Sequence, residues 1–195
     1  MLVEILLFLL STIISGNNSA LILGPLNSSR IMGKFSGSLF ISTFMSFGLI
    51  LEGMKMLPPI HVTPSYVPFV YLSVLIVFVI FSILSYPLSA GMVFTGSILA
   101  FSLISKEMDY FYYTIVFISW IVAFLSSIFL GFIFYSFSEK TKRPFRGYSF
   151  TILFLLSSAF LSYTLGSNTI GLIYSISPSY LNLISSIAGI FFGTF

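Results

Sequence analysis

Seven long apolar segments, separated by short breaks that contain charges, prolines or glycines, make up most of this sequence. They cover residues 2–15, 36–51, 67–86, 89–105, 111–136, 149–165 and 179–194. A helix needs about 20 apolar residues to cross the hydrocarbon core of a bilayer. Only 7% of the residues are charged, whereas a soluble domain carries about 25%. We therefore predict an all-α polytopic membrane protein with about six or seven transmembrane segments.

The length and composition exclude several classes of function. A chain of 195 residues with this many apolar segments has room for a single membrane domain, residues 1–195, and for almost no domain outside the bilayer. The sequence contains no cysteine, which excludes disulfides and thiolate metal sites. It shows no nucleotide-binding loop, metal-ligand cluster or nucleophile triad. We expect neither an enzyme, nor a bound cofactor, nor a nucleic-acid partner.

The basic residues predict an orientation. The densest cluster, "EKTKRPFR", falls in a loop at residues 138–147, and the positive-inside rule assigns it to the cytoplasm. Counting the crossings back places the turn with Arg30 and Lys34 on the same side, which agrees with the rule, and places the N-terminus outside. Because residues 89–105 are few and follow Pro87, they form either a full span or half of a broken one. We expect a multi-pass protein of the cell membrane.

Two polar clusters interrupt the apolar pattern. The first polar cluster is "SGNNS" (residues 15–19) and the second is "LGSNTIG" (residues 165–171). Five predicted crossings separate them, so the chain enters them from opposite faces of the membrane. Paired glycine-rich breaks in inverted repeats are typical of secondary transporters, and lipid cannot satisfy the backbone groups that a break exposes.

We therefore expect two inverted-repeat, broken-helix (re-entrant) motifs. The first repeat covers about residues 1–105 and a partial second repeat covers about residues 111–195. The alternative interpretation is that each polar cluster forms a surface turn.

The first polar cluster, extended to "SGNNSALILGPLNSSR", resembles the first repeat signature of the inorganic phosphate transporter (PiT) family, approximately G-A-N-D-x-A-N-x-x-G-P. With Gly24 and Pro25 as anchors, Asn17 occupies the family's asparagine and Asn18 its aspartate. Leu21 replaces the second asparagine. The second polar cluster is similar to the second copy of the signature, with Ser167 and Asn168 in the G-A-N positions and Thr169 at the aspartate.

Two further stretches resemble the family in order and spacing. "PLSAGMVFTG" (residues 87–96) is similar to P-V-S-T-T-H-x-x-V-G and keeps Pro87, Ser89 and Gly96, and "ISWIVAF" around Trp120 is similar to S-W-I-V-S-P. The resemblance implies a helical transporter of phosphate or a related oxyanion, coupled to a proton or sodium ion. Both family aspartates are absent, which argues against sodium coupling. The family also continues past the position of Phe195, so we expect a homo-oligomer or a partner chain that supplies further spans.

The candidate substrate site combines both polar clusters with two further residues. The amide and hydroxyl groups of the clusters are expected to hold phosphate or a similar anion near the bilayer midplane, and a guanidinium binds oxyanions in a bidentate manner. The predicted site residues are Asn17, Asn18, Ser19, Ser167, Asn168, Thr169, Arg30 and Ser89. Arg30 has a second interpretation as a plain cytoplasmic anchor. The competing hypothesis for the whole chain is a non-transporting scaffold or accessory subunit that keeps the fold without the coupling carboxylates.

Overall fold

The computed structural model describes residues 1–58, 62–84, 88–106, 108–141 and 148–195, and these contain helices and no strand. The described parts of all seven predicted apolar segments are mainly helical, which confirms the all-α class for these residues. The helices are α1 (Leu2–Ser28), α2 (Lys34–Leu51), α3 (Val67–Ile83), α4 (Ala90–Ser105), α5 (Tyr110–Thr141), α6 (Tyr148–Thr164), α7 (Gly171–Ser175) and α8 (Tyr180–Thr194), with a short 3₁₀ turn η1 (Gly53–Lys55) and a π-helical segment η2 (Leu165–Ile170).

Three of these helices are long and apolar enough to cross a membrane. They are Leu2–Ser28, Lys34–Lys55 and Tyr110–Ser136, and shorter apolar helices cover Val67–Phe81, Ala90–Ser105 and Tyr180–Thr194. Their length and composition support a membrane protein.

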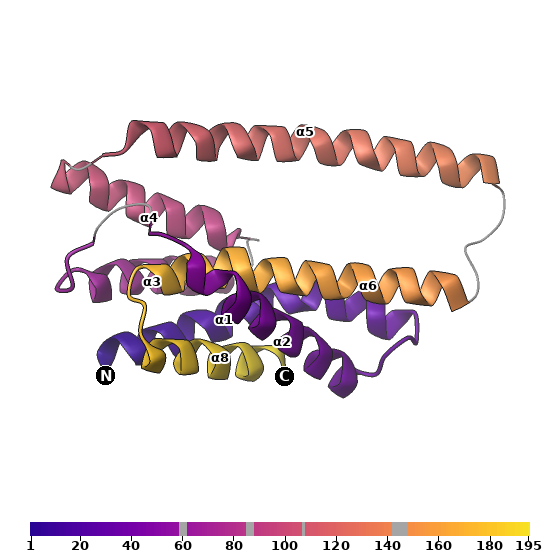
Figure 1. The fold of residues 1–195 in the computed structure, drawn as a ribbon, viewed down its shortest axis with the longest axis horizontal. Coiled ribbons are helices and arrows are strands. Elements are labelled where there is room, and N and C mark those ends of the chain that lie inside the picture. The colour runs from indigo at the N-terminus through magenta and orange to yellow at the C-terminus, as the bar shows by residue number, and fades with distance from the viewer. Residues whose placement is uncertain (59–61, 85–87, 107, 142–147) are drawn as a thin grey trace.

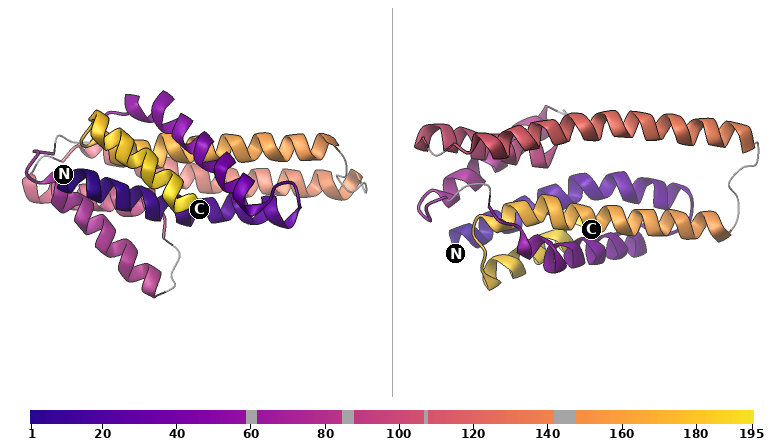
Figure 2. Two further views of the ribbon diagram at one scale, coloured as in Figure 1. Left: turned by 90° about the horizontal axis from the view of Figure 1, so that it is seen from below. Right: turned by 45° about the horizontal axis from the view of Figure 1, so that its top comes forward.

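The long helices lie roughly along one axis and alternate in direction (Figure 1). The α1–α2 turn lies at the same end of the molecule as the end of α5 and the start of α6 (Figures 1 and 2). We call this the basic end, because it contains Arg30 and Lys34 and the helix ends that flank the basic sequence. Of the predicted loop at 138–147, residues 138–141 continue α5 and residues 142–147 lie outside the described residues. Arg30, Lys34 and the end of α5 therefore lie at one end of the molecule.

Helices α3 and α4 are short and form a hairpin. They contain 17 and 16 residues, which is about 25 Å of helix for each and less than the roughly 30 Å of a bilayer core. Both helices lie in the part of the molecule away from the basic end (Figure 1). The sequence leaves residues 89–105 as either a full span or half of a broken one, and the structure has a single helix, Ala90–Ser105, a little shorter than a full span. Pro87 lies outside the described residues.

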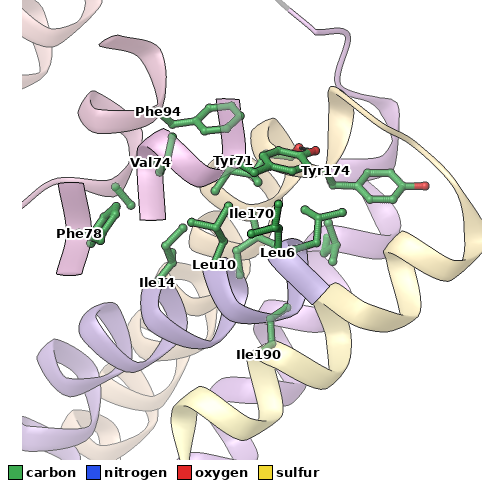
Figure 3. Close-up of a cluster of buried hydrophobic side chains, with 14 of the residues drawn as sticks. Leu6, Leu10, Ile14, Tyr71, Val74, Phe78, Phe94, Ile170, Tyr174 and Ile190 are labelled. Atoms are coloured by element: carbon green, nitrogen blue, oxygen red, sulfur yellow. Dashed lines mark hydrogen bonds between the residues drawn. The ribbon is translucent and has the colours of Figure 1, made fainter. Parts of the chain in front are cut away.

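A buried apolar cluster holds this hairpin to the other helices (Figure 3). Leu10 and Ile14 of α1 and Phe94 of α4 are at most 1% exposed in this cluster. The buried Tyr71 of α3 donates its hydroxyl hydrogen to the carbonyl of Ile173 in α7 at 2.8 Å. Because burying an unpaired hydroxyl is costly, this bond fixes α3 against α7.

Small residues make the closest helix contacts. A Cβ on Gly16 of α1 would lie 2.9 Å from the carbonyl oxygen of Gly193 in α8, and a Cβ on Gly166 would overlap the backbone of Met45 in α2. In a bilayer, where lipid is as apolar as the side chains, small residues allow this close approach of backbones. Each polar cluster therefore contributes a glycine to a helix interface.

The first polar cluster does not break its helix, so that part of the prediction is wrong. Helix α1 is continuous from Leu2 to Ser28. The Ser15 hydroxyl donates to the carbonyl of Ser11 at 2.6 Å, and the Asn18 amide donates to the carbonyl of Ile14 at 2.9 Å. The polar side chains bond to carbonyls of their own helix, and a break is not needed to satisfy them.

The second polar cluster is a local change of helix type and is not an unwound break. Its residues form the π-helical segment η2 between α6 and α7, and the Gly171 N–H donates to the carbonyl of Gly166. The helix direction continues from α6 through α7 (Figure 1). Neither expected broken-helix motif is therefore found in the described residues.

Candidate functional site

A cavity of about 420 Å³ lies where α1, the start of α4 and η2 meet. We call it the central cavity. Its lining residues are Asn17, Asn18 and Leu21 of α1, Leu88, Ser89, Ala90 and Gly91 at the start of α4, and Leu165 and Thr169 of η2. Cavities that bind small molecules span about 300 to 1,000 Å³, so the volume suits a small ligand with some of its water.

The two polar clusters reach this cavity from opposite directions. Helix α1 runs toward the basic end and α6 runs away from it (Figures 1 and 2). Asn17 and Thr169 therefore lie on antiparallel elements and line the same cavity. This arrangement agrees with the opposite approach that was predicted from the parity of crossings, although both elements are helical.

The polar side chains around the cavity are largely free to bind a ligand. Among the described residues, the side chains of Asn17, Ser89 and Thr169 have no hydrogen-bond partner. Asn18 uses its amide group to bond the carbonyl of Ile14, which fixes the side chain and leaves its oxygen available. The cavity thus presents an amide donor and two hydroxyls that the protein itself does not use.

The start of α4 adds backbone donors. Ser89 is the N-cap residue, its backbone is extended, and its side chain makes no capping bond. The first bond of the helix runs from the N–H of Val93 to the carbonyl of Ser89 at 3.1 Å. The N–H groups of Ala90 and Gly91 have no acceptor within the helix, and the N-terminus of a helix carries partial positive charge. Anions are favoured at such a position.

None of the cavity's lining residues is ionisable. The field inside comes from amide, hydroxyl and backbone dipoles. Among the described residues, no group of three or more histidine, cysteine, aspartate or glutamate side chains is placed to hold a metal ion.

Four predicted site residues do not line the cavity. Ser19 and Ser167 are buried and donate to carbonyls of their own helical segments, those of Gly16 and Thr164, at 3.2 Å each. Asn168 is exposed outside the cavity. Helical geometry explains this division, because neighbouring residues on a helix point in different directions. Each polar cluster therefore has one side in the cavity and another side in a helix interface.

Arg30 is the fourth of these residues. It is exposed in the α1–α2 turn at the basic end, with a positive φ of 58°. It lies outside the central cavity. The structure therefore agrees with the alternative interpretation, a basic residue in a turn.

Several lining residues were not predicted from the sequence. Ala90 and Gly91 contribute backbone at the start of α4, and Leu21, Leu88 and Leu165 contribute apolar walls. A serine directly before an apolar run is a helix N-cap signal, so Ser89 could have indicated the free N–H groups that follow it. The leucines carry no signal of their own in an apolar sequence.

Comparison with known proteins gives no further guide to this site. No protein-family model, no curated protein and no solved structure matches the chain.

Proposed function

We propose that this protein binds a small tetrahedral oxyanion, inorganic phosphate in the first place, in the central cavity and carries it across the cell membrane. The observation that carries the proposal is that Asn17, Asn18, Ser89 and Thr169, from three separate elements, line one cavity. These side chains share one cavity without bonding to one another, so they are available to a polar ligand. Lipid would leave these groups unsatisfied at a cost of several kcal/mol each.

The chemistry of the cavity favours an anion over a cation. The Asn17 amide, the two hydroxyls and the N–H groups at the start of α4 can all donate hydrogen bonds. The positive end of the α4 dipole points in the same direction as these donors. A phosphate ion offers acceptor oxygens on every side, so it can accept bonds from all three elements at once.

The residues that line the central cavity also indicate which ion could drive phosphate transport. No carboxylate lines the cavity, so no charged side-chain oxygen is present there to hold a dehydrated sodium ion. We therefore propose proton coupling or uniport for this chain. We place the cavity near the bilayer midplane in this proposal, because the antiparallel α1 and α6 and the start of α4 supply its lining from both directions. The N-terminus is proposed to face outward.

Uptake of radiolabelled phosphate into liposomes that contain the purified chain tests this function. Uptake is measured with no gradient, with an imposed proton gradient and with an imposed sodium gradient. We expect accumulation driven by the proton gradient, or gradient-independent equilibration, and no response to sodium. Phosphate flux equal to that of empty liposomes under all three conditions would exclude transport by this chain alone.

A matched pair of variants in the second polar cluster locates the site. Thr169→Val removes a hydroxyl that lines the cavity, whereas Asn168→Leu changes the adjacent exposed residue outside it. Loss of one hydrogen bond to a charged ligand costs about 1.5 to 3 kcal/mol, so Thr169→Val should weaken phosphate binding about 10- to 100-fold. Asn168→Leu should leave it unchanged. Equal effects of the two substitutions would mean that phosphate does not occupy this cavity.

The second candidate function is a non-transporting membrane scaffold, alone or as an accessory subunit. The observation that favours it is the use of Gly16, Ser19 and Gly166 in helix packing, which gives the polar clusters a structural role without any solute. Phosphate that neither binds nor moves, in a chain that still elutes as a folded, monodisperse protein in detergent, would favour this alternative.

A further inference from the structure

A second cavity continues the central cavity toward the basic end. It has a volume of about 190 Å³, lies between α1 and α6, and is lined in part by Leu21, Pro25, Ser158 and Leu161. Leu21 also lines the central cavity. We call the second space the basic-side cavity.

The lining residues follow one face of each helix. On α1, the residues that line the two cavities in turn are Asn17, Leu21 and Pro25. On the antiparallel segment of η2 and α6, they are Leu165 and Leu161. Residues four apart lie on the same face of a helix. The two cavities therefore lie one after the other along a single groove between α1 and α6, and Leu21 stands between them.

Pro25 removes a backbone hydrogen-bond donor from the part of α1 that lines this groove. It lies inside α1 and has no N–H, so the carbonyl of Leu21 lacks the donor that the next turn of a helix normally supplies. Both residues line the basic-side cavity. In hydrocarbon such a carbonyl costs several kcal/mol, and this backbone is tolerated where water or a polar group reaches it.

Ser158 gives a second, independent reason for water. Ser158 is 6% exposed and lines the basic-side cavity. Its hydroxyl has no hydrogen-bond partner within the described part of the chain. Ser157 adds a neighbouring hydroxyl to the same wall. A lipid chain in this space would leave these oxygens unsatisfied, whereas roughly six water molecules at about 30 Å³ each would fill it.

We infer that this groove is the aqueous route between the central cavity and the basic end, and that the side chain of Leu21 closes it against Leu161 and Leu165. Leu21 is 74% exposed, so close packing does not hold its side chain. The route rests on the proposed function only for the solute that it carries. Its hydration and its closure at Leu21 are properties of the groove itself.

The absence of cysteine from the sequence allows a direct test with single-cysteine variants. The full chain carrying Ser157→Cys is reconstituted in vesicles, and a charged, membrane-impermeant methanethiosulfonate is added to the side that the basic end faces. We expect Cys at 157 to react readily from that side. The matched control is Ser127→Cys on α5, where the surrounding residues are exposed and apolar and lipid should prevent reaction. Equal, slow reaction at both positions would overturn the route.

Closure at Leu21 is tested in a Thr169→Cys background, with the reagent added on the same side. Leu21→Ala should raise the rate of reaction at position 169 several-fold, and Leu21→Phe should lower it. The control Leu23→Ala truncates a leucine of the same helix that lines neither cavity and should leave the rate unchanged. A misfolded variant cannot produce opposite changes for a smaller and a larger side chain. An unchanged rate in both Leu21 variants would overturn the closure.

The outcomes separate the route from the proposed function. If Cys at 157 reacts in a chain that does not bind phosphate, the route is supported and its solute is not phosphate. Unreactive Cys at 157 in a chain that still transports phosphate overturns the route and leaves the proposed function intact.

Discussion

The two polar clusters both contain glycine, serine and asparagine but have different backbones. Residues 15–19 remain α-helical within α1, whereas Leu165–Ile170 form a π-helical segment. In the first cluster the Ser15 hydroxyl and the Asn18 amide bond to carbonyls one turn earlier. In the second, glycines at both ends of the π segment meet neighbouring backbone, Gly166 at Met45 and Gly171 at Gly53.

The comparison shows two ways in which a polar cluster stays helical within an apolar chain. Its side chains can bond to the helix's own carbonyls, or the backbone can change locally to the i→i+5 pattern of a π-helix, which is frequent at functional sites. In both clusters the small residues serve packing while an amide or hydroxyl faces the central cavity. Three measurements would test this division of roles.

The largest effect is expected at Gly166. A methyl group there would overlap the backbone of Met45, whereas a methyl group on Gly24 would meet nothing within 4 Å. Gly166→Ala should lower the free energy of unfolding by about 1 to 3 kcal/mol, and Gly24→Ala should change it by less than about 0.5 kcal/mol. Gly16→Ala should lower the free energy of unfolding by an intermediate amount, because a Cβ on Gly16 would approach Gly193 less closely than a Cβ on Gly166 would approach Met45. Unfolding of the three variants in mixed micelles, followed by circular dichroism, measures this order, and equal values for Gly166→Ala and Gly24→Ala would contradict it.

An intermediate effect is expected at Asn17 on phosphate binding. Its side chain lines the central cavity and has no other partner among the described residues. Asn17→Leu should therefore weaken binding about tenfold or more. Ser19→Ala, in the same cluster but buried and bonded to the carbonyl of Gly16, should leave the dissociation constant unchanged. Calorimetric titration with phosphate compares the two, and a weaker affinity in Ser19→Ala alone would reverse the assignment of the two faces.

The smallest effect is expected within the packing face of α1. Ser15 donates to the carbonyl of Ser11 at 2.6 Å, and loss of such a bond inside a membrane protein costs about 0.6 kcal/mol. The hydroxyl of Ser11 is buried without a partner among the described residues, so Ser11→Ala should be neutral or stabilising. Thermal unfolding of both variants in the same detergent shows whether each substitution stabilises or destabilises the protein. A larger loss for Ser11→Ala than for Ser15→Ala would show that water or lipid pairs with Ser11.

Much of the fold was predictable, because each helix is encoded by a local run of apolar residues. The seven predicted segments all appear as helices, with ends that differ by a few residues in most cases. The first is the exception, because α1 continues from residue 15 to Ser28. Its polar side chains look like a break in a one-dimensional pattern, and only the geometry of the helix brings them within reach of its own carbonyls.

The candidate site was predictable in part. Asn17, Asn18, Ser89 and Thr169 were predicted and line one cavity, whereas Ser19, Ser167, Asn168 and Arg30 do not. The sequence places a residue in a cluster but does not fix its rotation about the helix axis relative to a neighbouring helix. That rotation is set by the glycine contacts of α1 with α8 and of η2 with α2.

By itself, the sequence determined the helical class, the positions of the apolar segments and the residue types available for a polar site, because hydropathy and composition act locally along the chain. Only the tertiary structure decided that the polar clusters stay helical, which of their residues meet in the central cavity, and that the start of α4 joins them. These features depend on contacts between segments far apart in the sequence, where the approach of one backbone to another selects a single face of each helix.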